Sequence, residues 1–118
     1  MKQERTYTMY IEDMLSAIDK IIEYTQGYDF TKFKRDYKTV DAVIRNFEII
    51  GEAAKNLSSE IKEQYSSVPW YEMYSLRNRI SHAYFGIDYE IIWDIITNHL
   101  PKNKIEIEKI SISSFKVR

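Results

Sequence analysis

The stretch KTVDAVIRNFEIIGEAAKNL, from Lys38 to Leu57, decides the fold. Apolar residues recur in it every three or four positions, which is the spacing of one face of an α-helix. We therefore expect a helix from about Lys38 to Asn56 with one long buried face. Gly51 lies within that face, and its bare backbone would let another helix approach closely. The predicted face comprises Val40, Val43, Ile44, Phe47, Ile50, Gly51, Ala54 and Leu57.

The segment before this stretch carries the same spacing. An apolar stripe predicts a first helix over about residues 6–26, which Gly27 would end. The stripe comprises Tyr7, Tyr10, Ile11, Met14, Leu15, Ile18, Ile21, Ile22 and Thr25. Between the two helices, YDFTKFKRDYK (Tyr28 to Lys38) mixes aromatic with charged side chains, and we expect a connector there.

Two more helices are expected directly after the central stretch. Ser58 can cap a short helix, because a serine side chain accepts a hydrogen bond from a free N–H of the first turn. Pro69 suits the start of a longer helix, which should end near Tyr84 with Gly86 beyond it. The side chains of this longer helix that should point inward are Trp70, Met73, Leu76 and Ile80.

The last part of the chain predicts one further long helix. Asp88 should cap it and Pro101 should interrupt it. Its inner face is expected to hold Ile91, Ile92, Ile95, Ile96 and either His99 or Leu100. The segment KIEIEKI, residues 104–110, alternates like a strand, but lysine and glutamate favour a helix, so we expect one or two helical turns. Residues 111–118 are expected to form a loose tail.

The composition supports a single helical domain. The chain has 118 residues, of which 44% are hydrophobic, so it can bury a core of its own. Its 3 glycines and 2 prolines are too few for the frequent turns of a strand-rich domain. With no internal repeat and no linker, residues 1–118 predict one all-α domain, a bundle of four to five helices with its core in about residues 6–105.

Charge and cysteine content exclude several classes of protein. A net charge of −1 argues against a protein that coats nucleic acid by bulk charge, although it allows a local basic site. The absence of cysteine removes disulfides and thiolate zinc sites, and it fits a reducing cytoplasm. No apolar run reaches the ~20 residues of a membrane span, and the N-terminus lacks the apolar region of a signal peptide. We therefore expect a cytoplasmic protein with no membrane segment.

The stretch SLRNRISHAYFG, Ser75 to Gly86, concentrates chargeable groups at the end of a predicted helix. Asn78 and His82 are four residues apart and share a helical face, so Asn78 could orient the imidazole. Arg77 and Tyr84 are seven apart and nearly align. Arg77 and His82 can also meet, because arginine is long and the helix ends there. The four side chains are therefore expected around the last turn and a half.

An imidazole beside a guanidinium can cleave RNA without a metal ion. Histidine can take the proton of a ribose 2′-hydroxyl or protonate the leaving oxygen. Arginine stays charged and suits a phosphate that gains negative charge in the transition state. The reaction prefers two proton-transfer groups, whereas His99, the other histidine, lies among apolar neighbours in the sequence. A two-fold homodimer would supply the second group by doubling every residue of the site.

Structural roles for the same residues stay open at this point. An arginine and a histidine at a helix end often only cap the helix and carry surface charge. Arg45, Glu48 and Glu52 have the spacing of a solvated, salt-bridged helix face. His99 fits a helix end or the edge of a core. No glycine-rich phosphate loop, His–Glu metal motif or Ser–His–Asp pattern is present in the sequence.

Three blocks of the sequence resemble the HepT-like toxins of the HEPN domain family. Arg77 to Tyr84, RNRISHAY, matches the R-x4-H-x-Y signature of HEPN domains. The blocks IGEAAKNLS (50–58), WYEMYSLRNRISHAYFGID (70–88) and IIWDIITNHLP (91–101) resemble that group in the same order. The likeness extends over roughly residues 7–105.

The resemblance implies an up-and-down HEPN-like bundle that dimerises around the motif helix and cleaves RNA without metal or cofactor. It assigns catalysis to Arg77 and His82 and a supporting role to Asn78. HepT-like toxins are typically encoded with an MntA-like minimal nucleotidyltransferase, an antitoxin that transfers AMP from ATP to the motif tyrosine, here Tyr84. An adenylylated Tyr84 would place bulk and negative phosphate beside Arg77 and His82 and so block RNA.

We therefore expect a cytoplasmic homodimeric endoribonuclease, the toxin of a type VII-like toxin–antitoxin pair. Two other classes stay open. The chain could be a non-catalytic helical module that binds a nucleotidyltransferase partner or a nucleotide through the same cleft. It could also be a purely structural dimeric bundle, in which Arg77 and His82 would be dispensable for every phenotype.

Overall fold

All regular secondary structure in the part of the chain that the structure describes is helical. The computed structural model describes residues 6–81 and 88–116, and the side chains of residues 6–75 and 88–110. No strand occurs in these ranges, so the all-α prediction is confirmed. In chain order the helices are α1 (Tyr7–Thr25), α2 (Phe30–Arg35), α3 (Tyr37–Asn56), α4 (Ser59–Gln64), α5 (Trp70–Ser81), α6 (Tyr89–Asp94), the π-helical segment η1 (Ile95–His99) and α7 (Leu100–Lys116).

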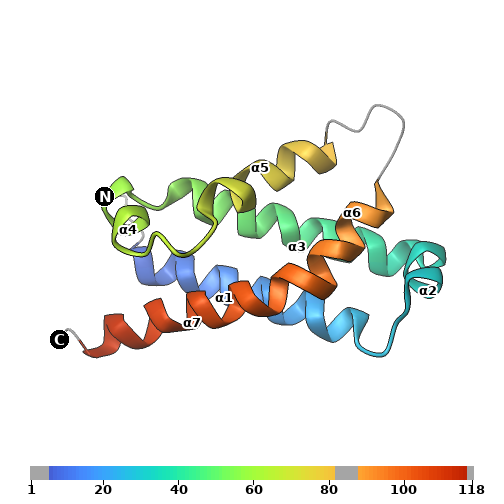
Figure 1. Ribbon diagram of the computed structural model, residues 1–118, viewed down its shortest axis with the longest axis horizontal. Coiled ribbons are helices and arrows are strands. Elements are labelled where there is room, and N and C mark those ends of the chain that lie inside the picture. The colour runs from blue at the N-terminus through green and yellow to red at the C-terminus, as the bar shows by residue number, and fades with distance from the viewer. Residues whose placement is uncertain (1–5, 82–87, 117–118) are drawn as a thin grey trace, which may run out of the picture.

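The long helices pack around the apolar face of α3 that the sequence predicts. α3 packs against α1 on one side and α5 on the other, and α7 packs against α1 (Figure 1). Within the predicted face Ile44 is half-buried, and the other seven residues are buried. The stripe of α1 is confirmed in the same way, with Ile11, Met14, Ile18 and Ile21 each at most 1% exposed. The side chains of α1, α3, α6 and α7 therefore form one continuous core.

Short polar side chains and one glycine set the helix ends. The carboxylate of Asp88 accepts the backbone N–H of Ile91 at 3.1 Å, and the Ser58 hydroxyl accepts that of Ile61 at 3.3 Å, as predicted. Gly27 has a φ of +79°, a left-handed conformation that side chains disfavour, just beyond the end of α1. These local interactions separate successive helices and allow the chain to reverse.

The predicted connector between the first two long helices is wrong in one respect. It contains the short helix α2, whose Phe33 is fully buried. The Phe33 ring lies 5.1 Å from that of Trp93 in α6, so α2 closes the core between α3 and α6. Aspartates begin the helices on both sides, because Asp29 accepts the N–H of Lys32 and Asp36 accepts that of Thr39.

The C-terminal part of the chain also differs from prediction. Pro101 does not interrupt the helix, and residues 111–116 are helical rather than a loose tail. The π-helical segment η1 widens the backbone just before Pro101, with the N–H of Leu100 bonded to the carbonyl of Ile95 five residues earlier. α6, η1 and α7 therefore follow one another without a break from Tyr89 to Lys116.

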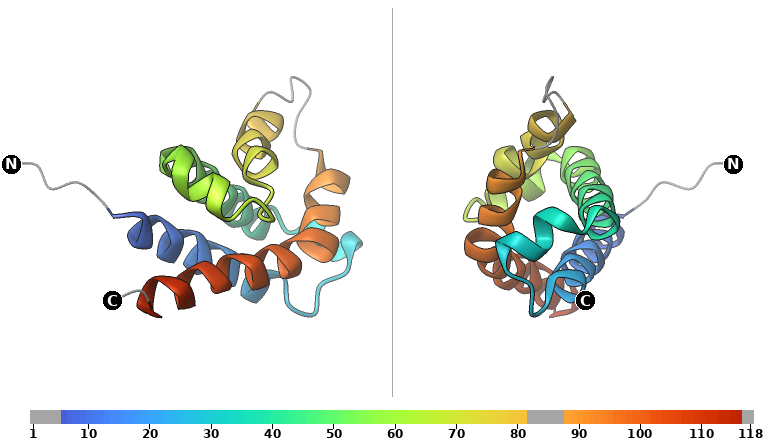
Figure 2. Two further views of the ribbon diagram at one scale, coloured as in Figure 1. Left: turned by 60° about the vertical axis from the view of Figure 1, so that its left-hand side comes forward. Right: turned by 90° about the vertical axis from the view of Figure 1, so that its right-hand side faces the viewer.

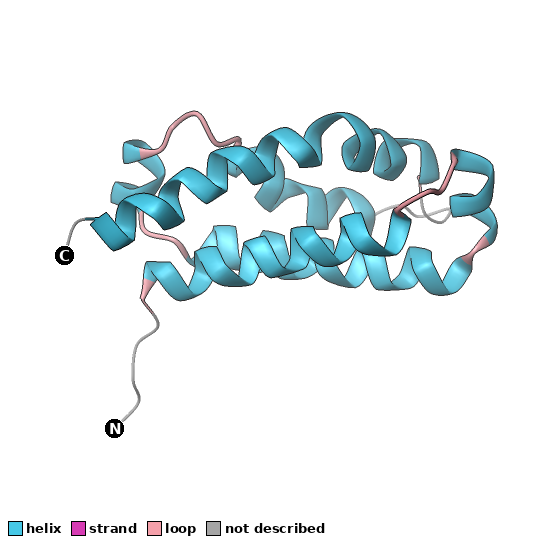
Figure 3. Ribbon diagram, turned by 90° about the horizontal axis from the view of Figure 1, so that it is seen from below, coloured by secondary structure: helices cyan, strands magenta, loops and turns pink. Residues whose placement is uncertain are grey.

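The two ends of the bundle differ in what they carry. α2, the last turn of α5 and the start of α6 lie at one end, and the start of α1 and the end of α7 lie at the other (Figures 1 and 2). Seen from below, the helices run along the long axis of the molecule (Figure 3). We call the first of these ends the motif end, because the last turn of α5, which begins the HEPN-like signature, and the start of α6, which follows the signature in the sequence, lie toward it.

Candidate active site

Helix α5 brings part of the predicted site to the motif end. Its first turn is fixed in the core, because Trp70 and Met73 are buried, as predicted. The side chains of Leu76 and Ile80, predicted to point inward as well, lie outside the described ones. The indole N–H of Trp70 donates a hydrogen bond to the carbonyl of Tyr65 at 3.0 Å, and the backbone N–H of Met73 donates to the carbonyl of Pro69 at 3.0 Å. α5 then continues along α3 as far as Ser81.

The four predicted site residues divide between described and undescribed parts of the chain. Arg77 and Asn78 lie in the second half of α5, where the backbone alone is described. His82 and Tyr84 lie outside the described residues. Arg77 follows Met73 by four residues, so its Cα lies one turn further along the same side of α5. The helical context that the motif requires at Arg77 and Asn78 is therefore present, and the meeting of the four side chains stays a prediction.

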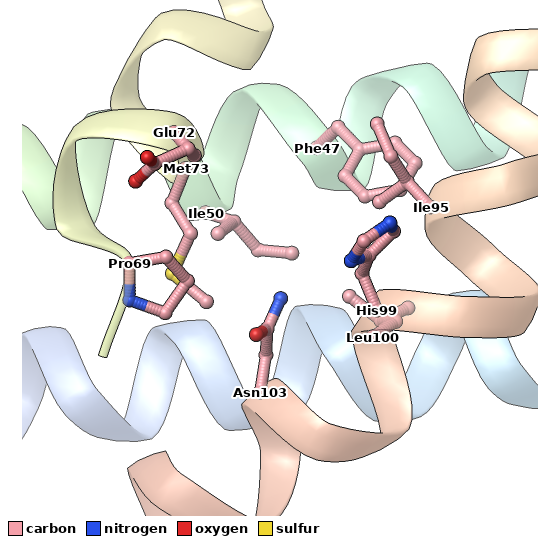
Figure 4. A pocket seen from close by; sticks show the side chains of 9 residues that line it. All are labelled: Phe47, Ile50, Pro69, Glu72, Met73, Ile95, His99, Leu100 and Asn103. Atoms are coloured by element: carbon pink, nitrogen blue, oxygen red, sulfur yellow. The ribbon is translucent and has the colours of Figure 1, made fainter. Parts of the chain in front are cut away.

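A cleft lies beside the first turns of α5, one turn from the backbone of Arg77. It has a volume of about 190 Å³ and lies between α3, α5, η1 and α7. Figure 4 shows the side chains of His99 and Asn103 pointing into it from the η1–α7 side, opposite Pro69 and Met73. The remaining lining residues are Phe47, Ile50, Glu72, Ile95 and Leu100. The cleft thus has an apolar floor and three polar groups at its margin.

His99 is the last residue of η1, which agrees with the helix-end alternative, and the buried position of the predicted inner face belongs to Leu100. The His99 side chain is 59% exposed, and its Nε2 atom lies 3.3 Å from a carboxylate oxygen of Asp94. On an ideal α-helix two residues five positions apart point about 140° away from each other. The π-helical segment brings Asp94 and His99 together instead. The sequence analysis assumed an α-helical period and therefore did not predict this pair. The nearby Pro101 is the signal that could have indicated it.

The charged face predicted on α3 is present. Arg45 and Glu48 are 3.9 Å apart, with side chains 73% and 40% exposed. With Glu52 they line a groove between α1 and α3, whose other walls include Tyr10 and Asp13. Such an exposed pair contributes little to stability, as expected for a solvated helix face.

The described residues form neither a metal-binding cluster nor a membrane-spanning helix. No three histidine, aspartate or glutamate side chains among them lie close enough together to hold a metal ion. None of the described helices is both long and apolar enough to cross a membrane.

Known proteins similar to this chain carry ribonuclease names. The protein named "Putative RNase MJ0127" from Methanocaldococcus jannaschii is 46% identical over 101 residues, which cover 86% of this chain and 84% of that protein. "Probable ribonuclease HepT" from Thermococcus cleftensis is 40% identical over 107 residues, or 91% and 97% of the two chains. "Gamma-glutamylcyclotransferase and putative RNase MJ0434", also from M. jannaschii, is 40% identical over 102 residues, which are 86% of this chain but 46% of that longer protein.

The family match covers the central stretch, the predicted site and most of α7. The profile of the family described as Ribonuclease HepT-like matches residues 14–110. No solved structure matches the chain significantly. The helical fold, the family match and the identities of 40–46% to proteins named as ribonucleases agree with one another. The chain therefore belongs to the Ribonuclease HepT-like family.

Proposed function

We propose that the protein is a metal-independent endoribonuclease whose active site is built from Arg77 and His82, with Asn78 in support. The observation that carries the proposal is the family match over residues 14–110, which includes the whole R-x4-H-x-Y motif. The fixed start of α5 adds support, since Trp70 and Met73 anchor the helix that presents Arg77.

The proposed reaction is an internal transesterification of RNA. His82 takes the proton of a ribose 2′-hydroxyl, and the 2′-oxygen forms a bond to the adjacent phosphorus. The bond from phosphorus to the 5′-oxygen of the next nucleotide breaks, and that oxygen is protonated, which leaves a 2′,3′-cyclic phosphate and a 5′-hydroxyl. Arg77 stabilises the negative charge that gathers on the phosphate oxygens.

The proposed active form is a homodimer. The reaction uses one group to remove a proton and another to donate one, and each chain provides one motif histidine. A two-fold axis near the motif end would place two copies of Arg77 and His82 around one RNA strand. Sedimentation over a range of protein concentrations tests this, and a chain that stays monomeric while it cleaves RNA would contradict it.

The proposed cellular role is that of a cytoplasmic toxin neutralised by a nucleotidyltransferase antitoxin. The hydroxyl of Tyr84 would attack the α-phosphorus of ATP, and pyrophosphate would leave. The resulting AMP group adds negative charge within two residues of His82, where it would repel RNA and occupy Arg77. Intact mass of the protein co-expressed with the transferase should increase by one or more AMP units, and Tyr84→Phe should prevent that increase.

Histidine replacement tests the catalytic assignment. His82→Ala should lower the rate of RNA cleavage by about 10²- to 10⁴-fold, which is the usual contribution of a general acid or base. His99→Ala is the matched control, because it removes the other histidine from an exposed position that the proposal does not use. Cleavage should be measured with and without EDTA on labelled RNA, and helical content by circular dichroism.

Three outcomes would decide against the proposal. Cleavage by His82→Ala at the rate of the unmodified chain would show that the histidine assignment is wrong. Loss of cleavage in EDTA would contradict a metal-independent reaction. A folded dimer that never cleaves RNA but binds the transferase or a nucleotide tightly would favour the non-catalytic binding module.

A further inference from the structure

The segment from Lys32 to Lys38 carries an unusual density of positive charge for a chain with a net charge of −1. Four of its seven residues are cationic: Lys32, Lys34, Arg35 and Lys38. All four are exposed at the junction of α2 and α3. We call these four residues and Tyr37 the basic corner.

Lys32 of the basic corner lies over the Tyr28 ring, with its Nζ atom 4.3 Å from the ring centroid, and its charge helps to lower the pKa of Asp36. The other three cations have no such partner among the described residues. Elsewhere Lys104 pairs with Asp19 at 2.8 Å and Lys109 with Glu106 at 3.2 Å. Among the described residues, no carboxylate forms an ion pair with any of the four corner cations. The field of the corner is therefore available to an external anion.

The two aspartates of this region are committed to backbone and hydroxyl donors. Asp29 accepts the N–H of Lys32 at 2.8 Å. Asp36 accepts the hydroxyl groups of Tyr28 and Thr39, both at 2.7 Å, and the N–H of Thr39 at 3.2 Å. These carboxylates hold the turn between α2 and α3 and reduce the positive field without removing it.

An aromatic ring accompanies the charge. Tyr37 is 70% exposed, and its neighbours in the sequence include Arg35 and Lys38. Exposed aromatic rings among cations are the usual surface for a single nucleic-acid strand, because the bases stack on the rings while lysine and arginine contact phosphates. A surface that attracts only an acidic protein does not need an exposed ring.

The basic corner is anchored to the core at the motif end of the bundle. Phe33, in the middle of α2, is fully buried and its ring packs on Trp93 of α6. α6 begins directly after the stretch that carries the motif, and Figure 2 shows α2 beside it at that end. A strand bound at the candidate active site could therefore continue over the corner.

We propose that Lys34, Arg35, Tyr37 and Lys38 form a binding surface for single-stranded RNA at the motif end of the bundle. Lysine and arginine would contact phosphates, and Tyr37 would stack on a base. This inference rests on the proposed RNA cleavage. The surface would determine the affinity for the RNA substrate and the orientation in which it binds, and would not change the rate of the chemical step. The RNA bound at this surface is the part of the substrate strand that lies beyond the scissile phosphate.

Binding should be measured separately from cleavage. The probe is a fluorescein-labelled single-stranded RNA of about 20 nucleotides, titrated with the full chain carrying His82→Ala, with anisotropy read between 50 and 200 mM salt. The corner variant adds Lys34→Gln, Arg35→Gln and Lys38→Gln. The matched control instead adds Lys20→Gln, Lys55→Gln and Lys102→Gln, three exposed cations on α1, α3 and α7 that form no ion pair with a described residue.

The corner variant should bind RNA at least about tenfold more weakly than its parent, and the slope of log K against log salt should fall by about 2, since each lost phosphate contact removes ~0.7. The control variant, which loses the same net charge, should change the affinity and the salt slope much less than the corner variant does. Tyr37→Ala should weaken binding by about fivefold or more, whereas Tyr37→Phe should retain the parent affinity.

Equal weakening by the corner and control variants would overturn the proposal, because general charge would then explain the effect. Unchanged RNA binding with weakened binding of the nucleotidyltransferase would overturn it in favour of an acidic protein partner. Cleavage by the chain with His82 restored is scored independently. RNA binding through the corner without any cleavage would refute the proposed reaction alone.

Discussion

Asp36 connects three parts of the structure through one carboxylate. It begins α3, follows α2 directly, and accepts hydrogen bonds from the hydroxyl groups of Tyr28 and Thr39 and from the backbone N–H of Thr39. The hydroxyl of Tyr28 is the largest cause of a lowered pKa at Asp36, followed by the two donors of Thr39. Because the pKa is lower in the folded chain than in the unfolded chain, the ionised carboxylate stabilises the fold above pH ~4. That contribution is lost as the pH falls through the folded pKa.

Asp36→Asn tests this linkage. The amide keeps one acceptor oxygen but has no charge, so the variant should unfold at a lower urea concentration than the unmodified chain at pH 7. The difference between the two should shrink as the pH falls below ~4, where the unfolded chain takes up a proton at Asp36, and then through the lower pKa of the folded chain. Urea midpoints at pH 7, 5 and 3 measure the effect. A difference that stays constant over this range would show that charge at Asp36 does not contribute.

Substitutions at Gly27 can measure the free-energy cost of a left-handed backbone conformation. The φ of Gly27 is +79°, and a Cβ atom added there would meet no other atom within 4 Å. Gly27→Ala should therefore destabilise the protein by about 1 kcal/mol through the left-handed conformation alone. Gly27→Asn should cost less, because asparagine tolerates this region better. Chemical denaturation of both variants gives the comparison, and an alanine variant as stable as the parent would contradict the explanation.

Among single residues, the sequence predicted the interactions between close neighbours in the chain. It did not predict interactions that form only once an intervening helical turn is in place. The cap by Ser58 and the break at Gly27 need only their own neighbours. The bond from Tyr28 to Asp36 joins residues eight positions apart across α2, and it could not be predicted until α2 was known. The Asp94–His99 pair was missed for the same reason, because it depends on a π-helical segment.

Among the helices, α2 is held to the bundle mainly by one aromatic side chain. Phe33 is fully buried against Trp93, whereas the other residues of α2 are exposed or half-buried. Phe33→Ala should cost about 3–5 kcal/mol or the whole docking energy of α2, whichever is smaller. Hydrogen exchange should then become faster in α2 before it becomes faster in the middle of α3. Uniformly faster exchange would show that α2 unfolds only together with the rest of the core.

The errors in the predicted helices have a common cause. The sequence between Tyr28 and Lys38 contains one deeply buried residue, Phe33, which is too little to produce a period. Beyond Pro101, the buried Ile107 and Ile110 and the bond from Ser67 to Glu106 at 2.7 Å hold α7 in place. Long segments with helical apolar spacing, such as α1 and α3, can be predicted from their own sequence. Short or proline-containing segments depend on the residues that they pack against in the folded chain.

For the whole molecule, helix content and core could be predicted because helical spacing is strong and turn residues are few. The candidate site could be predicted in part. The motif gave the residue types, and α5 provides the helix for Arg77 and Asn78. The basic corner was not predicted, although its lysines and arginine are evident in the sequence. Only the burial of Phe33 against Trp93 in the structure shows that this connector is held against the core at the motif end.

The start of α1 and the end of α7 lie at the pole of the bundle opposite the motif end (Figure 1). A second domain joined at either terminus would therefore lie away from the motif end and would leave the proposed RNA-binding surface uncovered. The longer M. jannaschii relative, in which the matched region is 46% of the protein, combines its RNase name with that of a gamma-glutamylcyclotransferase. This placement of the termini gives a geometric reason why such a fold tolerates being built into larger polypeptides.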